Sequence, residues 1–314
     1  METPPHHIPV VRDDVVRLLN PQPGETYFDG TAGYGGHAAA ILERTRPDGQ
    51  AILVDRDANA ITQLQERFGE RVEIMHDDYA GAANQLQEQG RMADMVLLDL
   101  GVSSPQLDIP GRGFSFRDEG PLDMRMDQTT GRTAADIVNQ ASERELADLI
   151  YRYGEDRKSR RIARAIAAHR PFTTTTELAG VVAAAVGHHE DIHPATRTFQ
   201  ALRIAVNDEL GQLQTALPNL VGLLKPGGRI AVISFHSLED RIVKEFFRTE
   251  SRDCNCPPEQ PICTCDHVAT LKLLTAKPIK GTEDSFNPRA RSAKLRAAAK
   301  LTSKPKGGTN DISH

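Results

Sequence analysis

Short apolar runs alternate with amphipathic stretches over the first hundred residues of the chain. Four runs have the length and composition of buried strands, at 26–28, 51–54, 71–76 and 92–100. Helical patterns such as the alanine-rich stretch 38–44 separate them, and the alternation resumes near Asn207. A fifth strand candidate, 230–235, follows a Lys-Pro-Gly-Gly turn at 225–228. Alternating strands and helices predict an α/β protein with a doubly wound, Rossmann-like sheet.

The central part of the chain lacks this alternation. After a loop at 111–127 come helical patterns at 133–139, 142–153, 157–169 and 176–186, and the amphipathic stretch 197–210. We therefore predict a discontinuous core formed by 1–106 and 205–300. An all-helical domain at 107–204 is inserted into it, and the composition of 301–314 is typical of a disordered tail.

A glycine-rich turn, Asp29-Gly-Thr-Ala-Gly-Tyr-Gly-Gly-His37, follows the first strand candidate. Gly35 and Gly36 lie directly ahead of a helix, where glycine lets the backbone approach a ligand and leaves helical N–H groups facing it. Asp55 ends the second strand, where an acid can accept both hydroxyls of a ribose. An ordinary tight turn is the alternative for the glycines, and a helix cap is the alternative for Asp55, in competition with Asp57. Strand, turn, helix, strand and acid in register favour a nucleoside-cofactor site.

Two further strand ends carry candidate site residues. Asp77-Asp78-Tyr79 follows the third strand, and an aromatic there offers an adenine a stacking face, although Tyr79 also suits the core. Asp99 ends the fourth strand. Carboxyl ends of parallel strands border the same crevice of a doubly wound sheet, so we expect Asp55, Tyr79 and Asp99 to lie near one another.

Longer strings extend the pattern over the whole chain. They are Asp99-Leu-Gly-Val-Ser-Ser-Pro-Gln106, Gly111-Arg-Gly-Phe-Ser-Phe116, Asp123-Met-Arg-Met126, Arg197-Thr-Phe-Gln-Ala-Leu-Arg-Ile204, Ser234-Phe-His-Ser-Leu-Glu-Asp-Arg241 and Asn287-Pro-Arg-Ala-Arg-Ser-Ala-Lys-Leu-Arg296. Together with the glycine-rich turn, these strings resemble the bacterial 16S rRNA (cytosine-N4)-methyltransferases. The resemblance runs nearly end to end, from His7 to Arg296.

The resemblance implies an activity and a cofactor. The activity is methylation of a cytidine N4 amine in the decoding region of 16S rRNA, in the small ribosomal subunit, with S-adenosylmethionine (SAM) as donor. The implied cofactor-binding residues are Gly35, Gly36, His37, Asp55, Tyr79, Asp99 and Gln106.

Asp99 is also the candidate catalytic residue. A cytosine amine is a poor nucleophile because its lone pair is delocalised into the ring, and a placed carboxylate can hold its hydrogens while the lone pair turns toward the methyl group. The paired prolines and the aromatic that other amino-methyltransferases carry at this strand end are missing from Asp99-Leu-Gly-Val102. Asp99 therefore faces the cofactor, the amine or both. The transfer requires no metal.

The distribution of charge is more informative than its sum. A formal net charge of −5 does not favour an RNA-binding protein. Five cations nevertheless gather at Arg157, Lys158, Arg160, Arg161 and Arg164, and every charged side chain from 286 to 306 is basic. Both clusters suit phosphate contacts, with a solvated helix face as the alternative for the first. In the second we expect part of the run to be extended.

No apolar run approaches the length of a membrane span, and the N-terminus lacks a basic segment leading into an apolar one. These features predict a soluble, cytoplasmic protein. The oligomeric state stays open, a dimer included.

Four cysteines form the pairs Cys254-Asn-Cys256 and Cys263-Thr-Cys265. Such a cluster in a cytosolic chain is more often metal-binding than disulfide-bonded, and it could close a structural zinc site. The usual spacing has two residues between cysteines, so thiols in a surface loop are the alternative. His236 is interpreted as a helix cap without a catalytic role.

Two other classes of protein share some of these features. A dinucleotide-dependent dehydrogenase also uses a glycine-rich turn and an acid such as Asp55, but the sequence offers no His or Lys pattern for hydride transfer. A non-catalytic RNA-binding or assembly protein could retain the fold, and only turnover separates it from an enzyme.

Overall fold

The computed structural model describes residues 9–187, 192–257, 259–260, 262, 264–282 and 288–302. The chain forms two compact units, one from Met1–Leu100 with Leu213–His314 and the other from Gly101–Gln212. The insertion expected at 107–204 lies wholly within the second unit, and most of the expected tail lies outside the described residues. No helix in the described part of the chain is long and apolar enough to cross a membrane.

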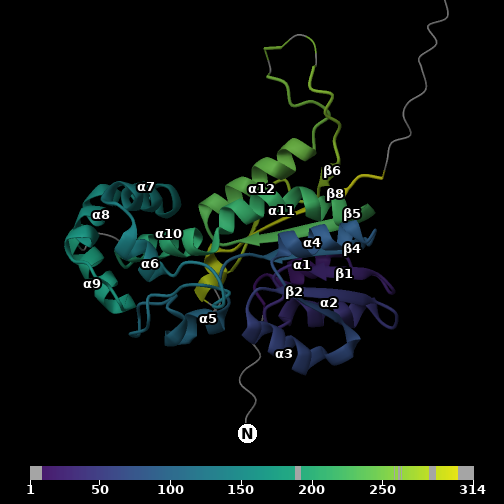
Figure 1. Ribbon diagram of the computed structural model, residues 1–314. Coiled ribbons are helices and arrows are strands. Elements are labelled where there is room, and N and C mark those ends of the chain that lie inside the picture. The colour runs from purple at the N-terminus through teal and green to yellow at the C-terminus, as the bar shows by residue number, and fades with distance from the viewer. Residues whose placement is uncertain are drawn as a thin grey trace, which may run out of the picture. The chain divides into compact units, whose positions relative to one another are not determined.

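The first unit is built on a mixed eight-stranded sheet (Figure 1). Five strands run parallel in the order β3-β2-β1-β4-β5: Glu73–His76, Gln50–Asp55, Thr26–Asp29, Ala93–Asp99 and Leu224–Ser234. β8 (Lys294–Lys300) pairs antiparallel with β5, and β6 (Leu271–Leu273) and β7 (Ile279–Lys280) both pair with β8. The strand order reverses between β1 and β4. In doubly wound sheets, ligands bind outside the carboxyl ends of the strands at this point.

Helices cover both faces of this sheet. Alternate residues of the central strands are buried on opposite faces of the sheet. In β4, Met95 and Leu97 are buried on one face, and Val96 and Leu98 are buried on the other. One face packs against α1 (Arg12–Leu19), α2 (Gly36–Thr45) and α3 (Ala58–Phe68). The other packs against α4 (Tyr79–Glu88), α11 (Glu209–Leu223) and α12 (Ser237–Glu250). The doubly wound fold predicted from the sequence is confirmed.

The second unit is helical. It contains α5 (Ser104–Asp108), α6 (Ala134–Gln140), α7 (Glu143–Gly154), α8 (Ser159–Ala168), α9 (Thr175–Val186) and α10 (Thr196–Asn207). Leu146, Ile162, Leu178 and Leu202 meet in one apolar core. Capping boxes begin α6, α7 and α9, which fixes where these helices start. Apart from an isolated bridge between Pro121 and Thr174, the described residues of this unit form no strands.

The Lys-Pro-Gly-Gly segment departs from the expectation of a turn ahead of the fifth strand. It lies inside β5 as a bulge. Leu224 pairs with Ala93 and Arg229 with Met95, so β5 advances five residues where β4 advances two. Gly227 has a φ of +80°, which accommodates the protruding backbone.

The basic stretch expected at 286–306 also differs in part from the sequence-based prediction. Its extended conformation, as β8, is confirmed, but two of its cations bind within the protein. Arg296 Nε donates to Asp240 Oδ1 at 2.7 Å, and Lys294 Nζ donates to Asp240 Oδ2 at 3.3 Å. We expected some cations of this run to face RNA, and Lys294 and Arg296 are not among them, because the carboxylate of Asp240 on α12 binds both.

Candidate active site

The glycine-rich turn joins β1 to α2 at the carboxyl edge of the sheet. Gly35 precedes α2 with a φ of +73°, and a Cβ at this position would lie 2.3 Å from a ring carbon of Phe68. Only glycine satisfies both the conformation and the contact with α3. Gly36 and His37 form the first turn of α2, whose backbone N–H groups have no helical acceptor and are suited to bind negatively charged or oxygen-rich groups.

Asp55 holds this turn in place. Its Oδ2 accepts a hydrogen bond from the N–H of Gly33 at 2.8 Å, and its Oδ1 accepts one from the N–H of Asp57 at 2.9 Å. Burial raises the pKa of Asp55, while these hydrogen bonds oppose the increase. Asp57 caps α3 by accepting from the N–H of Asn59. The sequence allowed either Asp55 or Asp57 to cap this helix, and in the structure the capping residue is Asp57.

Tyr79 is the first residue of α4 and is only 8% exposed. Asp78 caps the helix by accepting from the N–H groups of Ala80 and Gly81. Tyr79 packs in the sheet's apolar core, and a Cβ at Gly30 would lie 2.8 Å from the Tyr79 Cβ. The tyrosine therefore lies against the β1 turn, with most of its surface in the core.

Asp99 and Asp29 end the adjacent strands β4 and β1. Burial, together with the charges of Asp29 and Glu239, raises the pKa of Asp99 to about 8. Burial also raises the pKa of Asp29 to about 7, although Tyr27 Oη and the N–H of Thr31 donate to its carboxylate at 2.8 and 3.2 Å. These raised pKa values mean that the ligand-free site retains protons that ordinary carboxyls would lose, and that a bound cation would stabilise the ionised forms.

His37 faces this acidic group. Its side chain is 7% exposed, and its Nε2 lies 3.7 Å from Asp99 Oδ2, beyond hydrogen-bonding distance. Within the described residues, neither ring nitrogen of His37 nor Oδ1 of Asp99 has a hydrogen-bond partner. Burial, and to a smaller extent the charge of Arg12, lowers the pKa of His37 to about 4, so the imidazole is neutral at pH 7. Unpaired buried polar atoms are costly, and these atoms are suited to contact a polar ligand.

The remaining predicted residues have separate positions. Gln106 lies in the second unit, where its side-chain oxygen accepts from the N–H of Ser103 at 3.0 Å. His236 caps α12 by accepting from the N–H of Glu239, as interpreted from the sequence.

Sequence reasoning gave no role to Asp29 or Glu239. Asp29 could have been found because it ends the first strand in the same way that Asp55 and Asp99 end theirs. Glu239 is 2% exposed and lies within an ordinary capping pattern, so only the fold shows that its charge acts on Asp99.

The parallel sheet, the glycine turn clasped by an acid, and the acidic carboxyl edge define a site for a nucleoside cofactor with a cationic centre. SAM has this chemistry, since it joins an adenosine to a sulfonium. The fold and the site therefore match the class of Rossmann-like, SAM-dependent methyltransferases.

Comparison with known proteins gives the family. The sequence model of the MraW methylase family matches residues 5–301, and the chain belongs to this family. It is 53% identical over 307 residues to a protein from Syntrophotalea carbinolica, covering 94% of this chain and 98% of that one. A protein from Heliobacterium mobile is 48% identical, over 94% of this chain and 99% of its own. Both are named ribosomal RNA small subunit methyltransferase H.

The family expected from the sequence motifs is confirmed, and with it the SAM cofactor. Family membership excludes the dinucleotide-dependent dehydrogenase. Among solved structures, an rRNA methylase from Streptococcus thermophilus aligns over 96% of this chain and 99% of its own, with 9% identity and a TM-score of 0.41.

Proposed function

We propose that this methyltransferase transfers the methyl group of SAM to the N4 amine of a cytidine in the decoding region of small-subunit 16S rRNA. The observation that carries the proposal is the nearly full-length similarity to relatives named as small-subunit rRNA methyltransferases. The N4 atom and the decoding region come from the motif resemblance, and a ribosomal substrate supports the proposal of a cytoplasmic location.

We assign the cofactor residues from their places at the carboxyl edge. The N–H groups at Gly36 and His37, preceded by the left-handed Gly35, suit the polar end of SAM. Asp55 suits the ribose hydroxyls, because a carboxylate has about four acceptor sites and the backbone N–H groups of Gly33, Arg56 and Asp57 occupy only part of them. Tyr79 would border the adenine with the small part of its ring outside the core. Gln106 stays a prediction from the resemblance.

Asp99 suits the reacting end of the cofactor. SAM would supply the methyl group to the N4 lone pair, S-adenosylhomocysteine would leave as the S–CH₃ bond breaks, and the amine would lose one proton to solvent. The unpartnered Oδ1 of Asp99 can accept a hydrogen bond from the amine, which orients the lone pair. The cationic cofactor favours the carboxylate form of Asp99, whose pKa of about 8 in the ligand-free protein would otherwise keep much of it protonated at pH 7.

The test is a methylation assay with nucleoside identification. Small subunits and 16S rRNA that lack the modification are incubated with labelled SAM and the protein, and the rRNA is digested to nucleosides. We expect the label in N4-methylcytidine at a single position. Label in another nucleoside would overturn the amine assignment. No incorporation by a protein that still binds SAM would favour the non-catalytic assembly protein.

A further inference from the structure

The connection between α12 and β6, residues 251–270, is held at its two ends by hydrogen bonds such as that between His267 Nε2 and Thr249 O, and further out by Gln260 Nε2, which donates to Thr264 Oγ1. Its described residues form no helix or strand, and two apolar side chains are exposed, Ile262 at 74% and Val268 at 65%. The two ends of the connection are joined by a hydrogen bond from the N–H of Thr270 to the carbonyl oxygen of Glu250, at 2.8 Å. A connection of this length without secondary structure or an apolar core needs another source of order to offset its conformational entropy.

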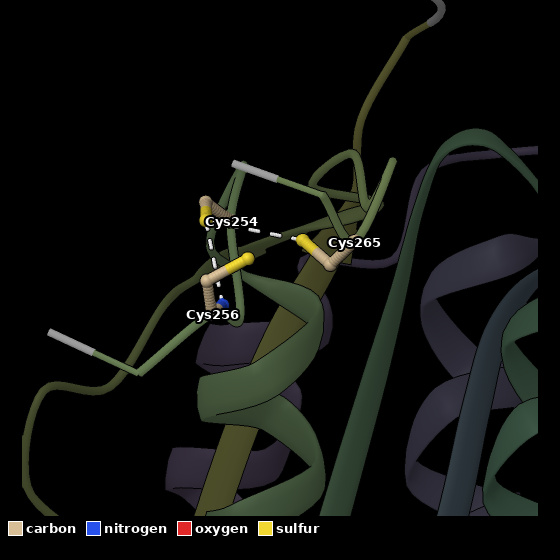
Figure 2. A group of neighbouring side chains, drawn as sticks. All are labelled: Cys254, Cys256 and Cys265. Carbon is tan, nitrogen blue, oxygen red and sulfur yellow. Dashed lines mark hydrogen bonds between the residues drawn. The ribbon is translucent and has the colours of Figure 1, made fainter. Parts of the chain in front are cut away.

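Three cysteine sulfurs converge in this connection (Figure 2). The Sγ atoms of Cys254, Cys256 and Cys265 all lie within 4.8 Å of one another. The Sγ atoms of Cys254 and Cys265 are 3.8 Å apart, far beyond the roughly 2.05 Å of a disulfide. Two thiolates bound tetrahedrally to one zinc ion at about 2.3 Å stand roughly 3.8 Å apart. Cys254 and Cys265 therefore have the sulfur separation of ligands that share one metal ion, and Cys256 lies close enough to be a third ligand.

The backbone of the connection also turns toward these sulfurs. Cys254 Sγ accepts from the N–H of Cys256 at 3.4 Å, and Cys265 Sγ accepts from the N–H of Asn255 at 3.4 Å. Cys256 Sγ accepts from the N–H of Thr264 at 3.5 Å. Each sulfur thus receives a backbone donor. Such donors favour the thiolate over the thiol and orient it, as the outer shell of a metal site does.

We propose that Cys254, Cys256 and Cys265 bind a structural zinc ion. Soft thiolates select zinc, copper(I) or iron–sulfur clusters, and three sulfurs all within 4.8 Å of one another suit one mononuclear ion better than a cluster, whose cysteines are distributed over two or more irons. Methyl transfer requires no metal, and none of the assigned SAM residues is a cysteine. The ion orders the connection and anchors β6 at the edge of the sheet. Cys263 lies outside the described residues, and the proposal does not depend on it.

Metal content tests the site directly. The full-length protein, purified without metal-affinity steps and under reducing conditions, is analysed by elemental mass spectrometry. We expect close to one zinc per chain in the wild type. Cys254→Ser and Cys265→Ser should lose most of it. Asn255→Ala is the matched control, because this exposed side chain lies between two of the ligands and its backbone N–H remains.

A second measurement tests the structural role and does not use enzymatic activity. Limited proteolysis within 251–270 should become faster in the two cysteine variants and in chelator-treated wild type, but not in Asn255→Ala. SAM binding, measured by calorimetry, should persist in all of them, which shows that the sheet remains folded. Three outcomes would overturn the zinc proposal. The wild type could bind no zinc even after zinc is added back, it could contain iron instead, or both cysteine variants could contain as much zinc as the wild type. None of these outcomes bears on the rRNA substrate.

Discussion

Asp55 accepts a hydrogen bond from the backbone N–H of Gly33, with 2.8 Å between Oδ2 and the nitrogen. The acid that ends β2 therefore fixes the turn that follows β1. An acid in this position has two uses, because the same carboxylate can hold the turn and accept ribose hydroxyls. Any change at Asp55 consequently acts on the cofactor both directly and through the glycine turn.

We expect Asp55→Ala to weaken SAM binding by roughly 1.5–3 kcal/mol, the usual value of a hydrogen bond to a charged group. Isothermal titration calorimetry measures this. Asp57→Ala is the control, because it removes the cap of α3 and retains the Asp57 N–H that Asp55 accepts. It should lower the free energy of unfolding by about 0.5–2 kcal/mol with little change in SAM affinity. Equal affinity losses in both variants would contradict a specific cofactor role for Asp55.

Asp99→Asn separates the two roles open to Asp99. If its carboxylate holds the target amine, turnover should fall by on the order of 10²–10³, as when one oxyanion-hole donor is removed, while SAM affinity changes much less. Single-turnover methylation gives the rate and calorimetry gives the SAM affinity, both on the same preparation. Parallel losses of affinity and turnover would place Asp99 on the cofactor instead.

The sequence predicted the parallel sheet because its strands are short apolar runs separated by helical patterns. The candidate site was inferred from position, since Asp55 and Asp99 directly end buried strands, and such ends converge at the strand-order reversal. Tyr79 shows the limit of this reasoning. The local sequence is compatible both with a tyrosine that stacks on adenine and with one that packs in the core. The burial of Tyr79 becomes visible only once α4 is placed against the sheet.

The C-terminal strands could not be predicted in the same way. β8 contains Lys294, Arg296 and Lys300, and its charge gives it the appearance of an RNA-binding segment. It becomes a buried strand because Asp240, more than fifty residues away in the sequence, neutralises two of its cations. Long-range ion pairs leave no local pattern, so sequence reasoning assigned these cations to phosphates.

The pKa values of the site predict a pH-dependent affinity. Asp99 and Asp29 have pKa values of about 8 and 7 in the ligand-free protein, and the SAM cation favours their ionised forms. Binding should therefore release protons, and SAM affinity should rise from pH 6 to about pH 8 and level off above it. Calorimetry in buffers of different ionisation enthalpy counts the protons, and Asp99→Asn should release fewer. Proton uptake on binding would contradict the assignment.

The same pKa values bear on the stability of the ligand-free protein. Between about pH 4 and pH 8 the folded state retains protons that the unfolded chain has lost. The contribution of Asp29 and Asp99 to the free energy of unfolding should therefore fall as the pH rises through this range. Asp29→Asn should weaken this trend in denaturant titrations at several pH values. An unchanged pH dependence would show that other groups determine it.

Arg296 should behave as a structural residue. Its side chain is 11% exposed and that of its partner Asp240 14%. Burial alone would raise the pKa of Asp240, but Arg296 and Lys294 bring it below the ordinary value. Arg296→Gln should cost about 1.5–3 kcal/mol of stability, because the partly buried carboxylate of Asp240 loses its shorter charged hydrogen bond and keeps only Lys294 as a charged partner. Chemical denaturation measures this loss, which should shrink as the pH falls through the lowered pKa of Asp240. A fully stable variant with weakened RNA binding would return Arg296 to the RNA-binding surface.

The remaining basic cluster is the better candidate for rRNA contact. α8 buries Ile162, Ala163 and Ile166 against the helical unit and leaves Arg160, Arg161 and Arg164 exposed. Arg164 lies 3.6 Å from the carboxylate of Glu143, and exposed ion pairs of this kind contribute little to stability. Changing the three arginines to glutamine should therefore keep the fold and SAM binding. RNA binding should weaken, and the log–log salt slope should fall by up to about 0.7–0.9 for each phosphate that the protein no longer neutralises.

The matched control for the α8 variant neutralises three exposed cations of the first unit, Lys244, Arg248 and Lys272. It alters the net charge by the same amount, so a purely long-range electrostatic effect would change both salt slopes equally. Direct phosphate binding by α8 predicts a reduced slope and reduced methylation in the α8 variant alone. Filter binding to 16S rRNA from low to physiological salt measures the slopes. If the α8 variant matches the wild type in slope and methylation, α8 presents only a solvated face, and exposed Arg291 becomes the next basic residue to test.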